Sequence, residues 1–198
     1  MGKSSNNGGA RRGRRVQRVT FVMPAPASFA LQPTLAGTLL ELRPLRAEDF
    51  DALYAAASDP LIWEQHPDSD RWKPDVFREF FRVAMESGGA LVAIDKNDGR
   101  IIGSSRFHDH RSDESVVEIG WTFLARSHWG GRYNGEMKAL MLRHAFRFVD
   151  RVLLVVGVSN LRSQKAVEKV GGVRVGTRLD PRGRECVIFQ IARDAVPR

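Results

Sequence analysis

The segment that most restricts the fold is residues 118–134, EIGWTFLARSHWGGRYN, which reads as a strand, a glycine loop and the start of a helix. Residues 118–124 are rich in Ile, Trp, Thr and Phe, which favour a buried strand. Gly130 and Gly131 allow a sharp turn and a close approach of the backbone to a ligand. A helical pattern begins at Asn134, and a helix N-terminus offers free N–H groups and a positive dipole end to an anion. We therefore expect this loop to bind a pyrophosphate.

The sequence on either side of this loop predicts a single α/β domain. Four-residue turns at 96–99 (KNDG) and 180–183 (DPRG) indicate β-hairpins. The strand before the glycine loop, the helix after it and the next strand form one crossover unit, so we expect a mixed sheet with helices on both faces. The expected strands are 38–45, 90–94, 101–107, 116–125, 152–158, 173–178 and 185–191, and the expected helices are 47–58, 74–87, 134–149 and 161–170.

The positive charge of the chain is concentrated at its start. The formal net charge is +8, and residues 1–20 carry +6 of it because they contain six Lys or Arg and no acid, which leaves 8 − 6 = +2 for the rest. Residues 1–37 lack periodicity, and we expect a disordered tail and connector there, followed by one domain at 38–193 and a C-terminal tail at 194–198. Arginine clusters attract phosphates, so nucleic-acid contact through residues 1–20 is an alternative to the favoured interpretation as a solubilising tail or a misassigned start.

The cysteine and histidine content indicates the cellular compartment and whether a metal site is expected. The single cysteine, Cys186, excludes an internal disulfide and suits a reducing cytoplasm. No apolar run approaches the roughly 20 residues that cross a bilayer. Pro24 and Pro26 interrupt the segment that most resembles an export signal. The five histidines show no metal-ligand spacing with Cys186, so we expect no metal site.

The glycine loop, the order of elements and NLRSQKAVEKVGG at 160–172 together resemble the GNAT acetyltransferase superfamily, and most of all its ribosomal-protein N-terminal acetyltransferase-like branch. The resemblance covers roughly residues 38–193. It implies a mixed, mostly antiparallel sheet with a central splayed parallel strand pair and helices on both faces. It also implies acetyl-CoA as acetyl donor, with no metal, and direct attack of an amine in a ternary complex; a homodimer is left open.

The resemblance also assigns residues to the cofactor. In this family the loop amides hold the pyrophosphate, the splayed strands admit the pantetheine arm, and the Asn-x-x-Ser segment lies beside the thioester. Taking Gly130 as the first loop glycine puts Ser127 where Gln or Arg is usual and Arg132 where Gly or Ala is usual. The cofactor-binding residues implied in this way are Phe123, Leu124, Arg126, Trp129, Gly130, Gly131, Arg132, Tyr133, Asn134, Asn160, Ser163 and Lys169.

Acetyl transfer to an amine needs a neutral nucleophile, a donor for the developing oxyanion and an exit for the thiolate. Glu118 is the candidate base, directly or through water, because burial in a cleft can make a carboxylate a better base; a structural ion pair is the equal alternative. The tyrosine that many family members use as acid is replaced by Val167, so Ser163 is the nearest candidate acid, with Asn160 beside the thioester. The resemblance implies a backbone N–H near residues 121–123 as the oxyanion donor.

Aromatic, basic and histidine side chains suggest the acceptor pocket by analogy with the family, although each taken alone is more often structural. They are Trp63, His66, Arg71, Arg106 and His108, with Trp72 nearby. A protein N-terminus, a polyamine, an antibiotic amine and an amino acid all remain open as acceptors, and the branch resemblance favours a protein or peptide amine. The alternative function is a catalytically silent acyl-CoA-binding regulatory module.

Overall fold

The structure is a computed structural model that describes residues 1–2 and 28–195, and within them one eight-stranded sheet runs in the order β1-β2-β3-β4-β5-β6-β8-β7. Only the β5–β6 pair is parallel, and the other neighbours are antiparallel. The expected mixed, mostly antiparallel fold is therefore confirmed. The strands are β1 Leu35–Ala36, β2 Leu40–Pro44, β3 Ala90–Asp95, β4 Ile101–Arg111, β5 Val116–Leu124, β6 Arg151–Gly157, β7 Val173–Leu179 and β8 Glu185–Ala192.

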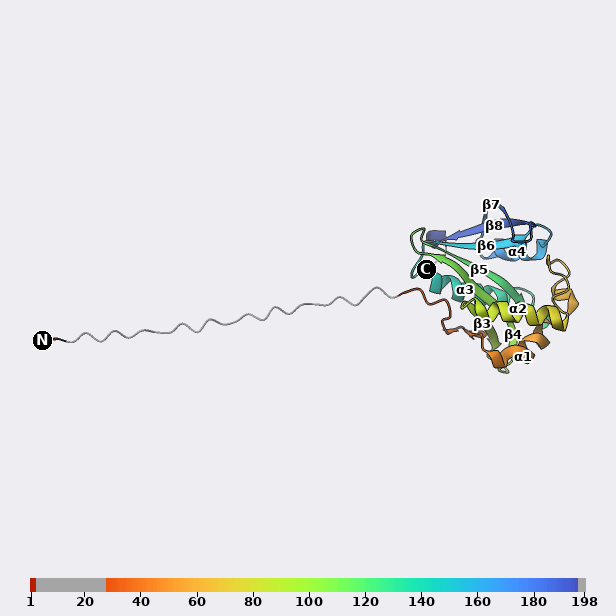
Figure 1. The fold of residues 1–198 in the computed structure, drawn as a ribbon, viewed down its shortest axis with the longest axis horizontal. Coiled ribbons are helices and arrows are strands. Elements are labelled where there is room, and N and C mark those ends of the chain that lie inside the picture. The colour runs from red at the N-terminus through yellow and green to blue at the C-terminus, as the bar shows by residue number, and fades with distance from the viewer. Residues whose placement is uncertain (3–27, 196–198) are drawn as a thin grey trace.

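Four α-helices cover the two faces of this sheet (Figure 1). Apolar side chains of α1 and α2 pack with Val92 and Phe123 in one core, and those of α3 and α4 pack with Phe107 and Ile119 in a second core. Residues of β4 and β5 therefore alternate between the two cores, as the pleat of a strand requires. The helices are α1 Phe50–Ala57, α2 Pro74–Glu86, α3 Arg132–Ala145 and α4 Leu161–Lys169, with 3-10 turns at Ala47–Asp49, Pro60–Ile62, Arg126–His128 and Arg193–Ala195.

The two central strands separate after a short parallel contact. β5 pairs with β6 only from Val116 to Glu118, and beyond that point β5 continues against β4 while β6 continues against β8 (Figure 1). A bulge accompanies the separation, because the β4–β5 register shifts after Ser104 and Trp121 has a φ of 51°. Such a bulge bends its strand and leaves residues out of the ladder. The sheet thus opens on the side where the glycine loop begins.

The ends of two elements differ from the sequence expectations. α3 begins at Arg132 rather than at 134 and ends at Ala145 rather than at 149. The helix stops early because its last turn tightens: Arg147 N–H bonds the carbonyl of His144 and Phe148 N–H that of Ala145, both three residues back. β4 extends to Arg111, beyond the expected end at 107, because its ladder with β5 continues.

The expected disordered tail is wrong for residues 28–37. Leu35–Ala36 forms an edge strand against β2, and the Phe29 ring lies 5.3 Å from that of Phe107 and 5.2 Å from that of His144. His144 Nε2 also bonds the Ala30 carbonyl at 2.8 Å. A few apolar anchors in a weakly patterned stretch were enough to fix it on the domain. Residues 3–27 of the predicted tail, including the arginine cluster, and residues 196–198 lie outside the described residues. Within the described part of the chain, no helix is long and apolar enough to cross a bilayer.

Candidate active site

The glycine loop has a conformation that only glycine adopts without strain. Gly130 has φ 102° and Gly131 has φ 104°, both in the region disfavoured for other residues. No atom lies within 4 Å of where a Cβ would stand on either residue, and both are exposed. The first helical hydrogen bond of α3 is from Gly135 N–H to the Gly131 carbonyl at 2.7 Å. The N–H groups of Arg132 to Asn134 in the first turn therefore have no acceptor within the helix.

A buried carboxylate holds this loop in place. Asp95, at the end of β3, is 4% exposed, and its Oδ2 accepts from His128 Nε2 at 3.1 Å and from the Tyr133 hydroxyl at 3.0 Å. The Asn97 N–H bonds Oδ1 at 2.9 Å, and this bond and those from His128 and Tyr133 hold the pKa of Asp95 below its usual range. The loop is thus fixed on both sides of its two glycines before any ligand binds.

Most of the side chains assigned to the cofactor already have partners in the protein. Phe123 and Leu124 are buried in the two cores, so only their backbone can face a ligand. Arg126 forms an ion pair with Asp59 of the loop after α1, so its guanidinium already has a counter-charge. Arg132 is exposed at the start of α3.

Trp129 and Arg162 connect the loop to the far side of the strand separation. The Trp129 Nε1 group bonds the Leu124 carbonyl at 3.0 Å, and the Arg162 guanidinium lies 4.3 Å from the Trp129 ring centroid. Arg162, in α4, also bonds the Ile62 carbonyl at 2.7 Å and Glu64 Oε1 at 3.1 Å. One arginine, which the sequence reasoning did not select, therefore joins the glycine loop, α4 and the loop after α1.

The Asn-x-x-Ser segment begins α4 directly after β6. Asn160 is 6% exposed and caps the helix, because its Oδ1 accepts the Ser163 N–H at 3.1 Å. This bond leaves the Nδ2 group of Asn160 available as a donor. Val167 is 6% exposed within the core, and its hydrocarbon side chain has no proton to donate. Lys169 is exposed at the opposite end of α4, separated from Asn160 by the length of the helix.

Glu118 lies at the last paired position before β5 and β6 separate. It is 5% exposed, and its Oε2 accepts from the Arg178 guanidinium of β7 at 2.6 Å. The ion pair that the sequence reasoning kept as an alternative is therefore present. Arg178 is largely exposed, so the pair has solvent on one side. The second oxygen of the Glu118 carboxylate, Oε1, points toward Gly120: a Cβ added to that glycine would lie 3.7 Å from it.

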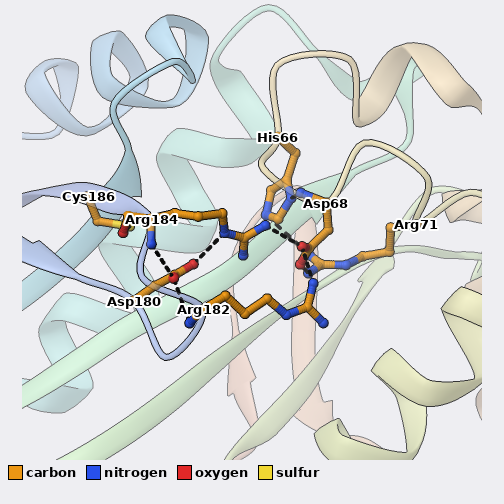
Figure 2. Close-up of polar contacts among 7 residues, drawn as sticks. All are labelled: His66, Asp68, Arg71, Asp180, Arg182, Arg184 and Cys186. Atoms are coloured by element: carbon orange, nitrogen blue, oxygen red, sulfur yellow. Dashed lines mark hydrogen bonds and ion pairs between the residues drawn. The ribbon is translucent and has the colours of Figure 1, made fainter.

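An arginine-rich cluster connects the loop before α2 with the β7–β8 turn (Figure 2). Asp68 lies at its centre: its Oδ1 accepts from Arg182 at 2.8 Å and from Arg184 at 2.7 Å, and its Oδ2 accepts from Arg71 at 2.5 Å. Arg184 also bonds Asp180 Oδ2 at 2.7 Å. Burial opposes ionisation of Asp68, but the Arg184 bond and the Arg71 charge keep its pKa below the usual range. Three guanidinium groups thus share one carboxylate.

The two pocket histidines differ in environment. His66 Nδ1 accepts the Asp68 N–H at 2.9 Å, and burial, together with the Arg71 charge, lowers the pKa of His66 to about 3. His66 is therefore neutral at pH 7 and too weakly basic to take a proton from an amine. His108 is exposed on β4 with its ring 5.0 Å from that of Trp121. Trp63 is 3% exposed and belongs to the core, so it supports the pocket from beneath.

Arg106 is buried without a counter-charge. It is 3% exposed, its Nε has no hydrogen-bond partner, and no ion pair reaches it from the described residues. Its guanidinium lies 4.5 Å from the Trp121 ring centroid. Burial lowers its pKa to about 10, with a contribution from the Arg71 charge. The sequence reasoning selected Arg106 as a pocket residue but had no means of showing that it is unpaired.

A buried lysine behind the bulge was missed. Lys138 of α3 is 5% exposed, and its Nζ donates to Thr122 Oγ1 at 2.5 Å and approaches Ser105 Oγ at 3.4 Å. Burial lowers the pKa of Lys138 to about 7. Lys138 lies three residues before Met141 and seven before Ala145, so it shares their face of the helix. This position within an apolar stripe was the sequence signal that Lys138 is buried.

Other features of the surface lie apart from the strand separation. A shallow hollow of about 600 Å³ is lined by residues of α1 and α2 such as Phe50, Arg78 and Met85, on the outer side of the helices. It has no titratable group in common with the strand separation. Among residues 1–2 and 28–195, no three His, Cys, Asp or Glu side chains come together as a metal site would need.

Comparison with known proteins places these observations in a family. Residues 40–173 match the Acetyltransferase (GNAT) domain family. No curated protein matches the sequence. A GCN5-related N-acetyltransferase from Brucella melitensis superposes with a TM-score of 0.75 at 20% identity, over 84% of this chain and 81% of that one.

Two further solved structures were determined with coenzyme A species. Mycobacterium smegmatis RimJ in complex with CoA-disulfide is similar at a TM-score of 0.64 and 20% identity, over 84% of this chain and 90% of that chain. Spermidine N-acetyltransferase from Vibrio cholerae, in complex with CoA and spermine, is similar at a TM-score of 0.62 and 17% identity, over 80% of this chain and 98% of that chain. At these identities the superpositions establish a common fold.

Proposed function

Because the chain belongs to the GNAT acetyltransferase family, we propose that the opening between β5 and β6 is where it moves an acetyl group from acetyl-CoA to an amine. A single observation carries this assignment: the parallel pairing stops at Glu118, and the strand that leaves it ends in the glycine loop. A candidate base therefore lies on β5, and a candidate anion site lies in the loop that follows β5.

The glycine loop is the proposed pyrophosphate site. The N–H groups from Gly130 to Asn134 lie at the positive end of α3, and the space around the two glycines admits close approach of phosphate oxygens. Arg126 is left out of this proposed pyrophosphate site, because its guanidinium forms an ion pair with Asp59. The two structurally similar proteins that hold coenzyme A species support the same ligand class here.

Glu118 is the proposed base. Its ion pair with Arg178 keeps the carboxylate oriented at the strand separation, and the pair can open because Arg178 is largely exposed. The amine proton passes to Glu118 directly or through water, and the neutral amine attacks the thioester carbonyl. As the acetyl carbon–nitrogen bond forms, the nitrogen releases a second proton to water. The carbon–sulfur bond breaks, and the thiolate takes a proton from water, directly or through the Ser163 hydroxyl, which water then reprotonates.

No tyrosine is available as the acid at α4. The chain has two tyrosines: Tyr133 bonds Asp95, and the Tyr54 hydroxyl bonds the Trp72 carbonyl at 3.2 Å. The Nδ2 group of Asn160 is the proposed donor beside the thioester, and the backbone at the Trp121 bulge is the proposed donor to the developing oxyanion.

The reaction is tested by thiol release from acetyl-CoA across a panel of amines, together with thermal stabilisation by acetyl-CoA alone. We expect stabilisation at saturating acetyl-CoA and acceptor-dependent thiol release. Stabilisation without turnover on any amine would favour the silent acyl-CoA-binding module instead. No stabilisation at concentrations far above ordinary affinities would refute the cofactor site.

The proposed catalytic unit is the packed domain from residue 28 to residue 193, with residues 1–27 dispensable for acetyl transfer. The cytoplasm is the proposed compartment because Cys186 is a free, buried thiol. A chain lacking residues 1–27 should keep the kcat/KM of the full chain. A loss of activity that parallels a loss of salt-dependent nucleic-acid binding would instead assign the arginine cluster a role.

A further inference from the structure

Arg106 stands apart from the other arginines on the α1–α2 side of the cleft. Each of its neighbours has a carboxylate: Arg71 bonds Asp68, Arg178 bonds Glu118, and Arg184 bonds both Asp68 and Asp180. Arg106 is the least exposed of them at 3%, yet within the described ranges no ion pair or side-chain hydrogen bond reaches it, its guanidinium lies over the Trp121 ring and its Nε is unsatisfied. The least exposed arginine on this side is therefore the one without an anion.

Such a group is costly in the free protein. Taking an ion out of water costs several kcal/mol in real proteins unless a counter-charge or hydrogen bonds repay it. A lysine or carboxylate escapes this cost by changing its protonation, but at a pKa of about 10 Arg106 is still charged at pH 7. The stack on the Trp121 ring offsets part of this cost. A bound anion would supply the remaining interaction.

The strand register places Arg106 close to the candidate base. Arg106 pairs with Gly120 and His108 pairs with Glu118, so side chains at these four positions leave the sheet on the same face. Gly120 has no side chain, and apart from its chain neighbours Ile119 and Trp121 a Cβ there would meet only Glu118 Oε1 within 4 Å. The sheet surface between the Arg106 guanidinium and the Glu118 carboxylate therefore carries no side chain at position 120. Two residues along a strand span roughly 7 Å.

We propose that Arg106 binds a carboxylate of the acceptor, so that the enzyme acetylates amines that carry a carboxylate near the amine. This rests on the proposed function of the cleft and narrows its acceptor. With the amine at Glu118 and the carboxylate at Arg106, the acceptor spans Gly120. Amino acids and peptides with an acidic residue next to the N-terminus have this chemistry.

The charge balance of the cleft agrees with an anionic acceptor. The arginines that face it are Arg71, Arg106, Arg178, Arg182 and Arg184, and the acids are Asp68, Glu118 and Asp180, which gives 5 − 3 = +2. His66 adds no charge at pH 7. A polycation would meet repulsion on this side, and like charges that approach without a counter-ion oppose binding. Polyamines are therefore disfavoured as acceptors.

The experiment compares acceptors that differ only in the carboxylate. Amino acids are paired with their α-carboxamides, and peptides with Asp at position 2 are paired with peptides with Asn there, which separates the two sources of the carboxylate. For the wild type we expect kcat/KM to favour the carboxylate member of at least one pair by about 10- to 100-fold, the size of a hydrogen bond to a charged group. Equal kcat/KM within every pair would overturn the proposal.

Two variants locate the effect. Arg106→Gln should abolish the preference while acetyl-CoA binding stays within about twofold, and Arg174→Gln, which removes an exposed arginine of β7, should leave the preference unchanged. If Arg106→Gln does not fold, Arg106→Lys tests the same point, because the ammonium keeps the charge without the two-pronged geometry and should give an intermediate preference. A wild-type preference retained in the folded Arg106 variant would overturn the proposal.

A calorimetric titration separates this inference from the function on which it rests. The carboxylate-bearing members of the pairs, the amino acids and the peptides with Asp at position 2, are titrated into wild type and Arg106→Gln in the presence of coenzyme A. Binding that depends on Arg106 without turnover on any amine would support the carboxylate site and refute acetyl transfer. Turnover without any dependence on the carboxylate would support acetyl transfer and refute the carboxylate site.

Discussion

Gly131→Ala tests whether the backbone conformation of the loop creates the anion site. Gly131 has φ 104° and ψ −34°, a region that residues with a Cβ rarely occupy. Holding alanine there costs about 1–3 kcal/mol. Since no atom lies within 4 Å of the new Cβ, this cost is conformational and not steric. The matched control is Gly135→Ala, four residues later inside α3, where no atom lies within 4 Å of a Cβ either.

The two substitutions should have opposite effects on stability. Gly131→Ala should lower the melting temperature by about 2–12 °C if the loop keeps its shape, taking about 2–4 °C per kcal/mol for a chain of this size. Gly135→Ala should raise it by about 1–4 °C, because alanine stabilises a helix interior by about 0.5–1 kcal/mol over glycine. Thermal unfolding followed by circular dichroism measures both.

Acetyl-CoA affinity decides between the possible responses of the loop. If the loop relaxes to avoid the strain, its binding-competent form lies about 1–3 kcal/mol higher and the Kd for acetyl-CoA rises about 5- to 150-fold. Calorimetric titration of the two variants and the wild type measures this change, and Gly135→Ala should bind nearly as the wild type does. A Gly131→Ala protein with unchanged Kd and unchanged melting temperature would refute the assignment of the anion site to this backbone geometry.

Three further predictions concern ionisable groups. Glu118→Gln should lower kcat by about 100-fold or more while acetyl-CoA affinity is kept, and an unchanged kcat across pH would remove Glu118 as the base. Glu136→Gln should destabilise the fold by about 1–2 kcal/mol. Burial opposes the ionisation of Glu136, but the N–H groups of Leu40, Thr38 and Leu39 keep its pKa below the usual range. The deficit measured by urea unfolding should therefore be full at pH 7 and shrink as the pH falls through that lowered pKa. Lys138→Met should gain stability relative to the wild type at pH 7 and lose that advantage toward pH 10. The reason is that the folded pKa of Lys138 is about 7 and its ordinary value is 10.5, so wild-type stability rises between them. A difference that is constant with pH would show that Lys138 is not neutralised by burial.

The sequence predicted the fold and the place of the glycine loop between strand and helix because both depend on local signals. One stretch of chain contains the loop glycines, the start of a helix and the change of the hydrophobic period from that of a strand to that of a helix. The order of the elements then leaves few possible topologies. The boundaries of the strands were close for the same reason. Residues 28–37 were assigned to the tail because isolated apolar anchors such as Phe29 carry no period.

The acceptor side could not be predicted in the same way. The contacts of Asp68 with Arg182 and Arg184 join residues 114 and 116 positions apart, so no local pattern announces them. The pairing of Glu118 with Arg178 joins residues 60 positions apart and is likewise non-local. For Arg106 the informative property is the absence of a partner, which only the three-dimensional arrangement can show. Sequence reasoning named Arg71 and Arg106 as pocket residues but not which of them lacks a counter-charge.

An NMR titration with acetyl-CoA tests whether the glycine loop and the strand separation form the cofactor site. Amide signals of uniformly ¹⁵N-labelled protein are followed as acetyl-CoA is added. We predict that the largest shifts fall on Gly130, Gly131 and the first turn of α3, with a second group around the Trp121 bulge and Asn160. Shifts confined to other surfaces, such as the outer side of α1 and α2, with the glycine amides unchanged, would contradict the assignment of the site.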